Sequence, residues 1–145
     1  MRLAQIAKIR NSKLEISMHK GFIKTAAILG ALSVVLGAFA AHTLKQRVSD
    51  DAINIFETSI RYQFYHVFAL LAAGILYKDF NNKFIKWAGI LFIAGIILFS
   101  GSLYFLTYIK ATSISGLNWI GAITPFGGLS FILGWICLFA GLLKK

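Results

Sequence analysis

Hydrophobic positions along this chain form long runs that are separated by short polar segments. A bilayer-spanning helix needs about 20 apolar residues at a rise of about 1.5 Å each. Three runs meet this length alone, at about 22–41, 87–109 and 119–143. A fourth run reaches it only as 60–77, with Arg61 extending its charge to the interface. Because backbone in lipid must satisfy its own hydrogen bonds, the pattern predicts an all-α integral membrane protein, a four-transmembrane-helix bundle.

A different pattern occupies residues 44–61, between the first two runs. One helical face is apolar and carries Val48, Ala52, Ile55, Phe56 and Ile60. Ser49 suits an N-cap, since Asp50 and Asp51 follow it in the first turn. Glu57 and Arg61 are four residues apart, a spacing that favours an ion pair. We predict a short external amphipathic helix between spans 1 and 2, lying at the membrane interface.

Composition supports a membrane protein and excludes several other classes. The chain has 145 residues, of which 58% are hydrophobic and 14% charged, whereas soluble domains carry about 25% charged residues. This excludes an ordinary soluble enzyme and a disordered chain. Cys137 is the only cysteine, so an intramolecular disulfide is excluded, and no Cys/His spacing typical of a metal site occurs. No cofactor motif is present either, so we predict neither a metal nor a cofactor.

The net charge of +10 is distributed unevenly over the predicted topology. The side of the two termini holds eleven basic residues: Arg2, Lys8, Arg10, Lys13, Lys20, Lys24, Lys78, Lys83, Lys86, Lys144 and Lys145. The opposite side holds four: Lys45, Arg47, Arg61 and Lys110. The positive-inside rule therefore predicts a multi-pass protein of the cell (inner) membrane with both termini in the cytoplasm. The basic face suits anionic lipid, whereas nucleic acid is not expected, because no basic stripe interleaves with aromatic residues.

The first seventeen residues differ from the rest of the chain. They are mixed and basic, and Met18 would make a normal cytoplasmic start for the first span. We therefore predict an N-terminal extension at 1–17 and a four-helix transmembrane domain at 18–145. An alternative stays open: Lys20 and Lys24, an apolar stretch and the A-x-A tripeptide at 38–40 resemble a cleavable secretory signal.

Glycines recur at a spacing that favours helix packing in lipid. Gly30 and Gly37 lie seven residues apart in the first span, and Gly127, Gly134 and Gly141 repeat the spacing in the fourth. Close approach of helices replaces the hydrophobic effect within a membrane, and a seven-residue period favours a left-handed crossing. We predict packing faces rather than a transport pathway along these stripes.

Polar residues that the helical rise places toward the outer side form the candidate site. They are His42, Glu57, Arg61, Tyr62, Tyr65, His66, Ser100, Ser102, Tyr104, Thr124 and Pro125. Polar groups in lipid need partners, so we predict that seven of them meet in one cluster: His42, Tyr62, His66, Ser100, Ser102, Tyr104 and Thr124. Pro125 removes a backbone hydrogen bond to Gly121, so it should kink or interrupt the fourth span. Zinc would require convergence of His42 and His66; hydrogen-bonded structural histidines are the favoured interpretation.

Four short motifs resemble a known family. Residues 37–45, GAFAAHTLK, resemble the G-A-F-x-A-H motif of the YgdD/YwdK-like membrane proteins, a domain-of-unknown-function family. RYQFYH at 61–66, FSGSLY at 99–104 and ITPFGG at 123–128 are similar too, although Ala40 stands where many relatives are expected to have Gly. The resemblance runs from about Met18 to the C-terminus. It implies a four-helix inner-membrane protein without signal cleavage, and it supplies no activity or catalytic residue.

Three functions stay open from the sequence. The favoured one is a non-catalytic membrane protein that acts by helix or lipid association, because no nucleophile–base pair is evident. The second is a small transporter or channel built as a homo-oligomer, although no Asp or Glu lies inside the apolar runs to relay protons. The third is a membrane enzyme or metal site that uses the outer His/Tyr/Ser cluster.

Overall fold

The structure is a computed structural model that describes residues 18–114, 116 and 118–143. All regular secondary structure in this part of the chain is helical. The extension predicted at 1–17 lies outside the described residues.

The first helix of the described residues, α2 (Lys20–His42), is fixed at its start by His19. The His19 Nδ1 accepts a hydrogen bond from the Phe22 N–H at 3.2 Å, which caps the helix. The same ring stacks on Phe22 with centroids 3.7 Å apart. The His19 backbone N–H donates to the Gly74 carbonyl at 2.9 Å. The start of α2 is therefore tied to the end of the next long helix.

A short 3-10 turn, η1 (Leu44–Gln46), leads into α3 (Asp50–Leu76). Ser49 caps α3 as predicted, because its Oγ accepts from the Ala52 N–H at 3.3 Å. The prediction of a separate external helix was wrong: residues 50–61 of that segment and the weak second span form one continuous helix of 27 residues. No Gly or Pro occurs between residues 50 and 73 to break it, and its buried face is continuous from Ala52 to Ala73.

The third run forms one long rod of three segments. It consists of α4 (Lys83–Gly95), a π-helical turn η2 (Ile96–Ser100) and α5 (Gly101–Thr112). The Asn82 Oδ1 caps the rod by accepting from the Phe84 N–H at 3.0 Å and the Ile85 N–H at 3.2 Å. Its Nδ2 donates to the Gly141 carbonyl at 2.9 Å. The rod is thus attached at its base to the last helix.

The fourth run begins as a 3-10 segment, η3 (Asn118–Ile123), and continues as α6 (Thr124–Leu143). Pro125 lies in the first turn of α6, where its missing N–H has no intrahelical partner to lose. The expected interruption is therefore a change of helix type between Ile123 and Thr124. Pro125 itself faces outward.

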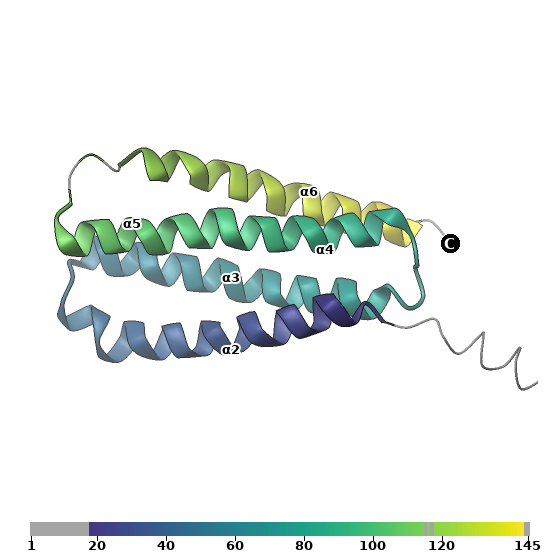
Figure 1. The fold of residues 1–145 in the computed structure, drawn as a ribbon, viewed down its shortest axis with the longest axis horizontal. Helices are drawn as coiled ribbons and strands as arrows, with labels where there is room; N and C mark the ends of the chain where they lie inside the picture. The colour runs from purple at the N-terminus through teal and green to yellow at the C-terminus, as the bar shows by residue number, and fades with distance from the viewer. Residues whose placement is uncertain (1–17, 115, 117, 144–145) are drawn as a thin grey trace, which may run out of the picture.

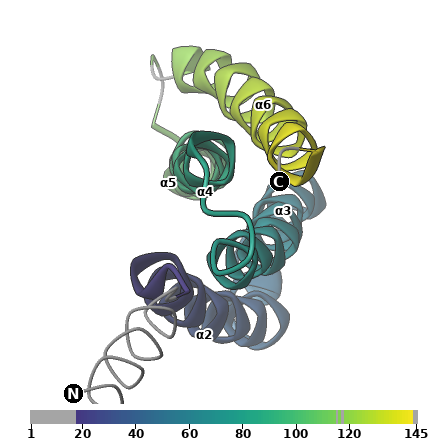
Figure 2. The same cartoon turned by 90° about the vertical axis from the view of Figure 1, so that its right-hand side faces the viewer.

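The helices lie side by side and roughly antiparallel (Figure 1). Helix α3 packs against α2 and against the α4–η2–α5 rod, while α6 packs against α4 and η2. Seen from the end, α2 and α6 are on opposite sides of the molecule (Figure 2). The start of α2 and the end of α6 lie at the same end, together with the turn between α3 and α4 (Figure 1). The interior between these rods is lined by residues such as Phe22, Leu70, Ile85, Phe92 and Phe131.

Three of the described helical stretches are long and apolar enough to cross a membrane: Lys20–Gln46, Lys83–Thr112 and Trp119–Leu143. Helix α3 is of similar length, but polar residues such as Arg61, Gln63 and His66 interrupt its apolar run. The structure itself therefore identifies three candidate spans among the residues that it describes.

Candidate functional site

Gln63 is the centre of a buried polar junction between α2, α3 and α5. Its side chain is 2% exposed. The Gln63 Nε2 donates to the Ser33 Oγ at 2.9 Å and to the Leu29 carbonyl at 3.1 Å. Its Oε1 accepts from the Tyr104 hydroxyl at 3.1 Å. Gln63 was missing from the predicted site, although an amide in an otherwise apolar stretch was a usable signal.

Three buried serines reinforce this region through backbone carbonyls. The Ser33 Oγ donates to the Leu29 carbonyl at 2.8 Å, and the Ser59 Oγ donates to the Phe56 carbonyl at 2.7 Å. The Ser100 Oγ, on the π-helical turn, donates to the Ser59 carbonyl at 2.8 Å. The last of these bonds joins α3 to the rod, so Ser100 belongs to this junction.

His66 forms a second, separate polar contact. Its Nδ1 lies 2.8 Å from the Tyr62 carbonyl oxygen, and the Trp135 Nε1–H donates to its Nε2 at 3.3 Å. The neutral tautomer with its hydrogen on Nδ1 satisfies both contacts. The ring also stacks on Phe131, with centroids 3.4 Å apart and planes 8° apart. His66 thereby connects α3 to α6.

Ser102 and Thr124 form a third contact, between α5 and the first residue of α6. Their hydroxyl oxygens are 2.8 Å apart. The Ser102 Oγ also donates to the Phe99 carbonyl at 2.9 Å. Since Ser102 has a single hydroxyl hydrogen, the Thr124 hydroxyl donates to Ser102 in this arrangement.

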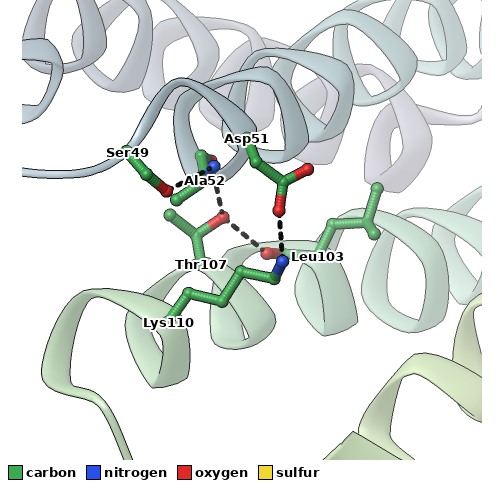
Figure 3. A network of polar contacts seen from close by, with 6 residues as sticks. All are labelled: Ser49, Asp51, Ala52, Leu103, Thr107 and Lys110. Carbon is green, nitrogen blue, oxygen red and sulfur yellow. Dashed lines mark hydrogen bonds and ion pairs between the residues drawn. The ribbon is translucent and has the colours of Figure 1, made fainter.

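A fourth contact joins the start of α3 to the end of α5 (Figure 3). Asp51 and Lys110 form an ion pair on the surface. Beneath it, the Thr107 Oγ1 donates to the Leu103 carbonyl at 3.0 Å and lies 3.4 Å from the Ala52 carbonyl. The Ser49 cap lies beside these groups, as Figure 3 shows. We call these residues, Ser49, Asp51, Ala52, Leu103, Thr107 and Lys110, the α3–α5 latch.

The predicted single cluster is divided among these separate contacts. His42 lies outward at the end of α2, whereas His66 is sixteen residues after Asp50, hence about 24 Å along α3. The two histidines were expected near one level because α3 was expected to begin near Ile60. Its start at Asp50 moves His66 away from the loop, so His42 and His66 do not converge.

The remaining candidate residues lie on the surface. Tyr62 and Tyr65 are 40% and 57% exposed, although the Tyr62 ring packs on Phe99 with centroids 4.6 Å apart. Glu57 and Arg61 face outward too, and neither forms an ion pair with another described residue. No group of three His, Cys, Asp or Glu side chains that could hold a metal occurs among the described residues.

Glycines of α6 lie against the rod. A Cβ added to Gly127 would be 2.7 Å from the Phe99 Cα, and one added to Gly134 would be 2.7 Å from the Phe92 ring. At Gly141 the same atom would be 2.6 Å from the Ile85 side chain. In α2, an added Cβ at Gly30 would be 3.4 Å from Val67, an ordinary contact, and Gly37 has nothing within 4 Å. The close-packing face is therefore on α6, not along the whole of α2.

Together these contacts can hold helices in a fixed arrangement. In the described part of the chain, every buried side-chain nitrogen or oxygen has a hydrogen-bond partner. Ser33, Ser59, Ser100, Gln63 and His66 all bind groups of neighbouring turns or helices.

Comparisons with known proteins agree on one family. The family model described as "Protein of unknown function (DUF423)" matches residues 36–128. A UPF0382 membrane protein of Staphylococcus epidermidis is 40% identical over 126 residues, which cover 84% of this chain and 98% of that protein. The UPF0382 membrane protein YwdK of Bacillus subtilis is 38% identical over 126 residues, covering 86% and 98%. A UPF0382 membrane protein of Haemophilus influenzae is 38% identical over 128 residues, covering 88% and 98%. No solved structure matches the chain.

Proposed function

The chain belongs to the DUF423 family, whose relatives above are membrane proteins, and we propose that it is a non-catalytic, multi-pass protein of the cell membrane. It acts through association with other helices and with lipid, rather than through a reaction. The resemblance to YwdK-like proteins in the sequence motifs is confirmed by these matches.

The observation that supports a non-catalytic role best is the state of His66. A general acid or base needs a ring nitrogen that can reach a substrate proton. In His66 both nitrogens bind groups of the protein, and one face of the ring is covered by Phe131. The most plausible catalytic group in the spans therefore has the contacts of a structural histidine.

We further propose that α3 is the fourth membrane span. It lies between α2 and the rod and runs beside both for its whole length (Figure 1). Of the polar residues that interrupt its apolar run, Gln63 and His66 are buried and paired within the protein, so they do not need water, whereas Arg61 is exposed and its long side chain can extend to the interface. A polar helix is acceptable in lipid when its polar groups face the interior in this way.

Both termini are assigned to the cytoplasm in this proposal. The described ends of the chain lie at one end of the molecule (Figure 1). Exposed basic residues gather at the same end: Lys20, Lys24, Lys78, Lys83 and Lys86. The positive-inside rule places such an end in the cytoplasm, where these lysines can contact anionic lipid.

Topology can be tested with C-terminal fusions. A fluorescent protein fused after Lys145 should be bright, and alkaline phosphatase at the same position should be inactive. A fusion after Arg47 should give the reverse pattern. Active phosphatase at the C-terminus would contradict the orientation, and like signals from both positions would contradict four spans.

The non-catalytic role can be tested with reconstituted protein and His66→Phe. Phe keeps the stacking on Phe131 but removes both polar contacts, so a structural histidine predicts a lower unfolding temperature in detergent. The purified wild type should support no ion or solute flux in proteoliposomes. A flux that His66→Phe abolishes at unchanged stability would replace this proposal with a transporter or channel.

A further inference from the structure

A shallow groove between α2 and α3 carries two exposed charges of opposite sign. It is lined by Gly37, Ala40, Ala41, Glu57, Ile60 and Arg61 and has a volume of about 310 Å³. The α2 side has only small residues, and a Cβ added to Gly37 would meet nothing within 4 Å. The charged side chains of α3 therefore lie beside open space rather than under another helix. We call this feature the α2–α3 groove.

The groove lies toward the loop end of the two helices. Gly37 is only five residues before the end of α2 at His42, which corresponds to about 8 Å. Side chains on a helix lean toward its N-terminus, and the N-terminus of α3 is at the loop. Glu57 and Arg61 thus reach toward the membrane surface, where long charged side chains are stable.

The two charges are arranged in a definite order. Arg61 follows Glu57 by one turn, so its position is about 6 Å deeper along α3. In a phospholipid with an amino headgroup, the phosphate is nearer the acyl chains and the ammonium is further out. A guanidinium binds phosphate through paired hydrogen bonds, and the carboxylate above it suits the ammonium. The order of charges therefore matches this headgroup from inside to outside.

Apolar surface continues below the groove. Val34 on α2 is 63% exposed and Phe68 on α3 is 56% exposed. The Phe64 and Phe68 rings pack edge to face, with centroids 5.0 Å apart. Acyl chains leaving a headgroup in the groove would run along this surface.

We propose that the α2–α3 groove binds the headgroup of a zwitterionic aminophospholipid, with Arg61 on the phosphate and Glu57 on the ammonium. This deepens the proposed association with lipid and rests on it in one respect: the loop between α2 and α3 must lie at a membrane surface. It does not depend on which surface that is.

The test uses the purified full chain in detergent and native mass spectrometry. Phosphatidylethanolamine and phosphatidylglycerol with identical acyl chains are titrated separately, and the dissociation constant of the first bound lipid is compared. Phosphatidylglycerol can also bind the basic lysine end of the molecule, so the preference for phosphatidylethanolamine is taken as the ratio of the two dissociation constants in the wild type divided by the same ratio in Gly37→Leu, which fills the groove. We expect this preference to be about threefold to fivefold, the range of an exposed ion pair. A preference of one would overturn the proposal.

Two substitutions test which headgroup charge each of the two side chains binds. Glu57→Gln should remove the preference for phosphatidylethanolamine and leave phosphatidylglycerol binding unchanged. Arg61→Gln should weaken both lipids by a similar factor. The matched controls are Asp50→Asn and Arg47→Gln, exposed residues near the same loop but outside the groove. A preference that survives Glu57→Gln, or that Asp50→Asn removes equally, would contradict the assignment.

A third variant tests the groove itself. Gly37→Leu should fold, because the site has open space, and it should weaken phosphatidylethanolamine binding by filling the groove. If this variant instead converts a dimer into a monomer, the groove is a contact between copies and the lipid site is wrong. If the fusion results contradict the topology but Glu57→Gln still has its expected effect, the lipid site is retained. Only the membrane leaflet to which it is assigned then changes.

Discussion

Two junctions in this protein hold helices together by different means. At the contact between α6 and the α4–η2–α5 rod, Gly127, Gly134 and Gly141 let backbone and rings approach closely. At the contact of α3 with α2 and α5, the helices are joined by Gln63, buried serines and the α3–α5 latch. The first junction depends on the absence of side chains, and the second on particular polar atoms. They should therefore fail in different ways when residues are changed.

The largest effect is expected from Gly127→Ala at the glycine junction. The added methyl would collide with the backbone of Phe99, which cannot rotate away as a side chain could. Overpacking of this kind costs about 1–3 kcal/mol, and we expect the upper end, measured as the free energy of unfolding in mixed micelles. Gly37→Ala is the matched control and should be neutral or stabilising, because its site is open and Ala favours helices. Equal destabilisation by both would refute the contrast.

A smaller loss is expected from Gln63→Leu at the polar junction. Leu has a similar size, but the Tyr104 hydroxyl and the Ser33 hydroxyl would each lose a partner. An unsatisfied buried group costs about 1–3 kcal/mol in general, and measured hydrogen bonds between membrane helices are weaker. We expect a loss of about 1–2 kcal/mol. Adding Tyr104→Phe should then cost less than Tyr104→Phe alone; strict additivity would show that the two residues are uncoupled.

Ser102→Ala should have a modest effect, because it removes a single contact between α5 and α6. Thr124 would lose its hydroxyl partner at a partly buried position. We expect about 0.5–1 kcal/mol in unfolding free energy. Thr112→Ala, which removes an exposed hydroxyl bonded within its own helix, should change it less. A larger loss at Thr112 than at Ser102 would argue against the inter-helix role.

The smallest effect is expected from Asp51→Asn in the α3–α5 latch. The Asp51 side chain is 69% exposed and that of Lys110 is 40% exposed, and exposed ion pairs contribute about 0–1 kcal/mol. The loss should shrink further at high salt. Thr107→Val, which removes the buried part of the same latch, should cost more. The reverse ranking would show that the surface charge pair holds the two helices.

Sequence patterns located the helices better than the contacts between them. The apolar runs located α2, the rod and α6, and Ser49 followed by two acids marked the start of α3. The continuity of α3 was missed because its pattern changes from amphipathic to apolar near Ile60, although no breaker residue lies there. A change of pattern was mistaken for a change of element.

The polar contacts depended on information that spacing does not contain. His66 and Trp135 are 69 residues apart, and their meeting requires the rotation of both helices about their axes. The expected depth of His66 was calculated from the expected start of α3. Because that start was placed too far along the chain, the expected position of the cluster was wrong as well. The seven-residue glycine spacing placed Gly127, Gly134 and Gly141 on one face of α6, but the same spacing at Gly30 and Gly37 did not mark a close contact, so the spacing defines a face without showing what packs against it.

The π-helical turn at Ile96–Ser100 lets the two ends of the rod, α4 and α5, differ in their rotation about the rod axis. Its wider ring, seen in the bond from the Gly101 N–H to the Ile96 carbonyl, accommodates about one residue more than an α-helical turn would. If the same residues were wound as regular α-helix instead, α5 would be turned by about 100°, one residue's rotation, relative to α4. Phe92 would still face α6, but Ser102 would no longer point at Thr124, nor Thr107 at α3. Helices α4 and α5 can therefore each present the face that suits their own neighbours. Two separate short helices could do the same, but they would need a loop between them.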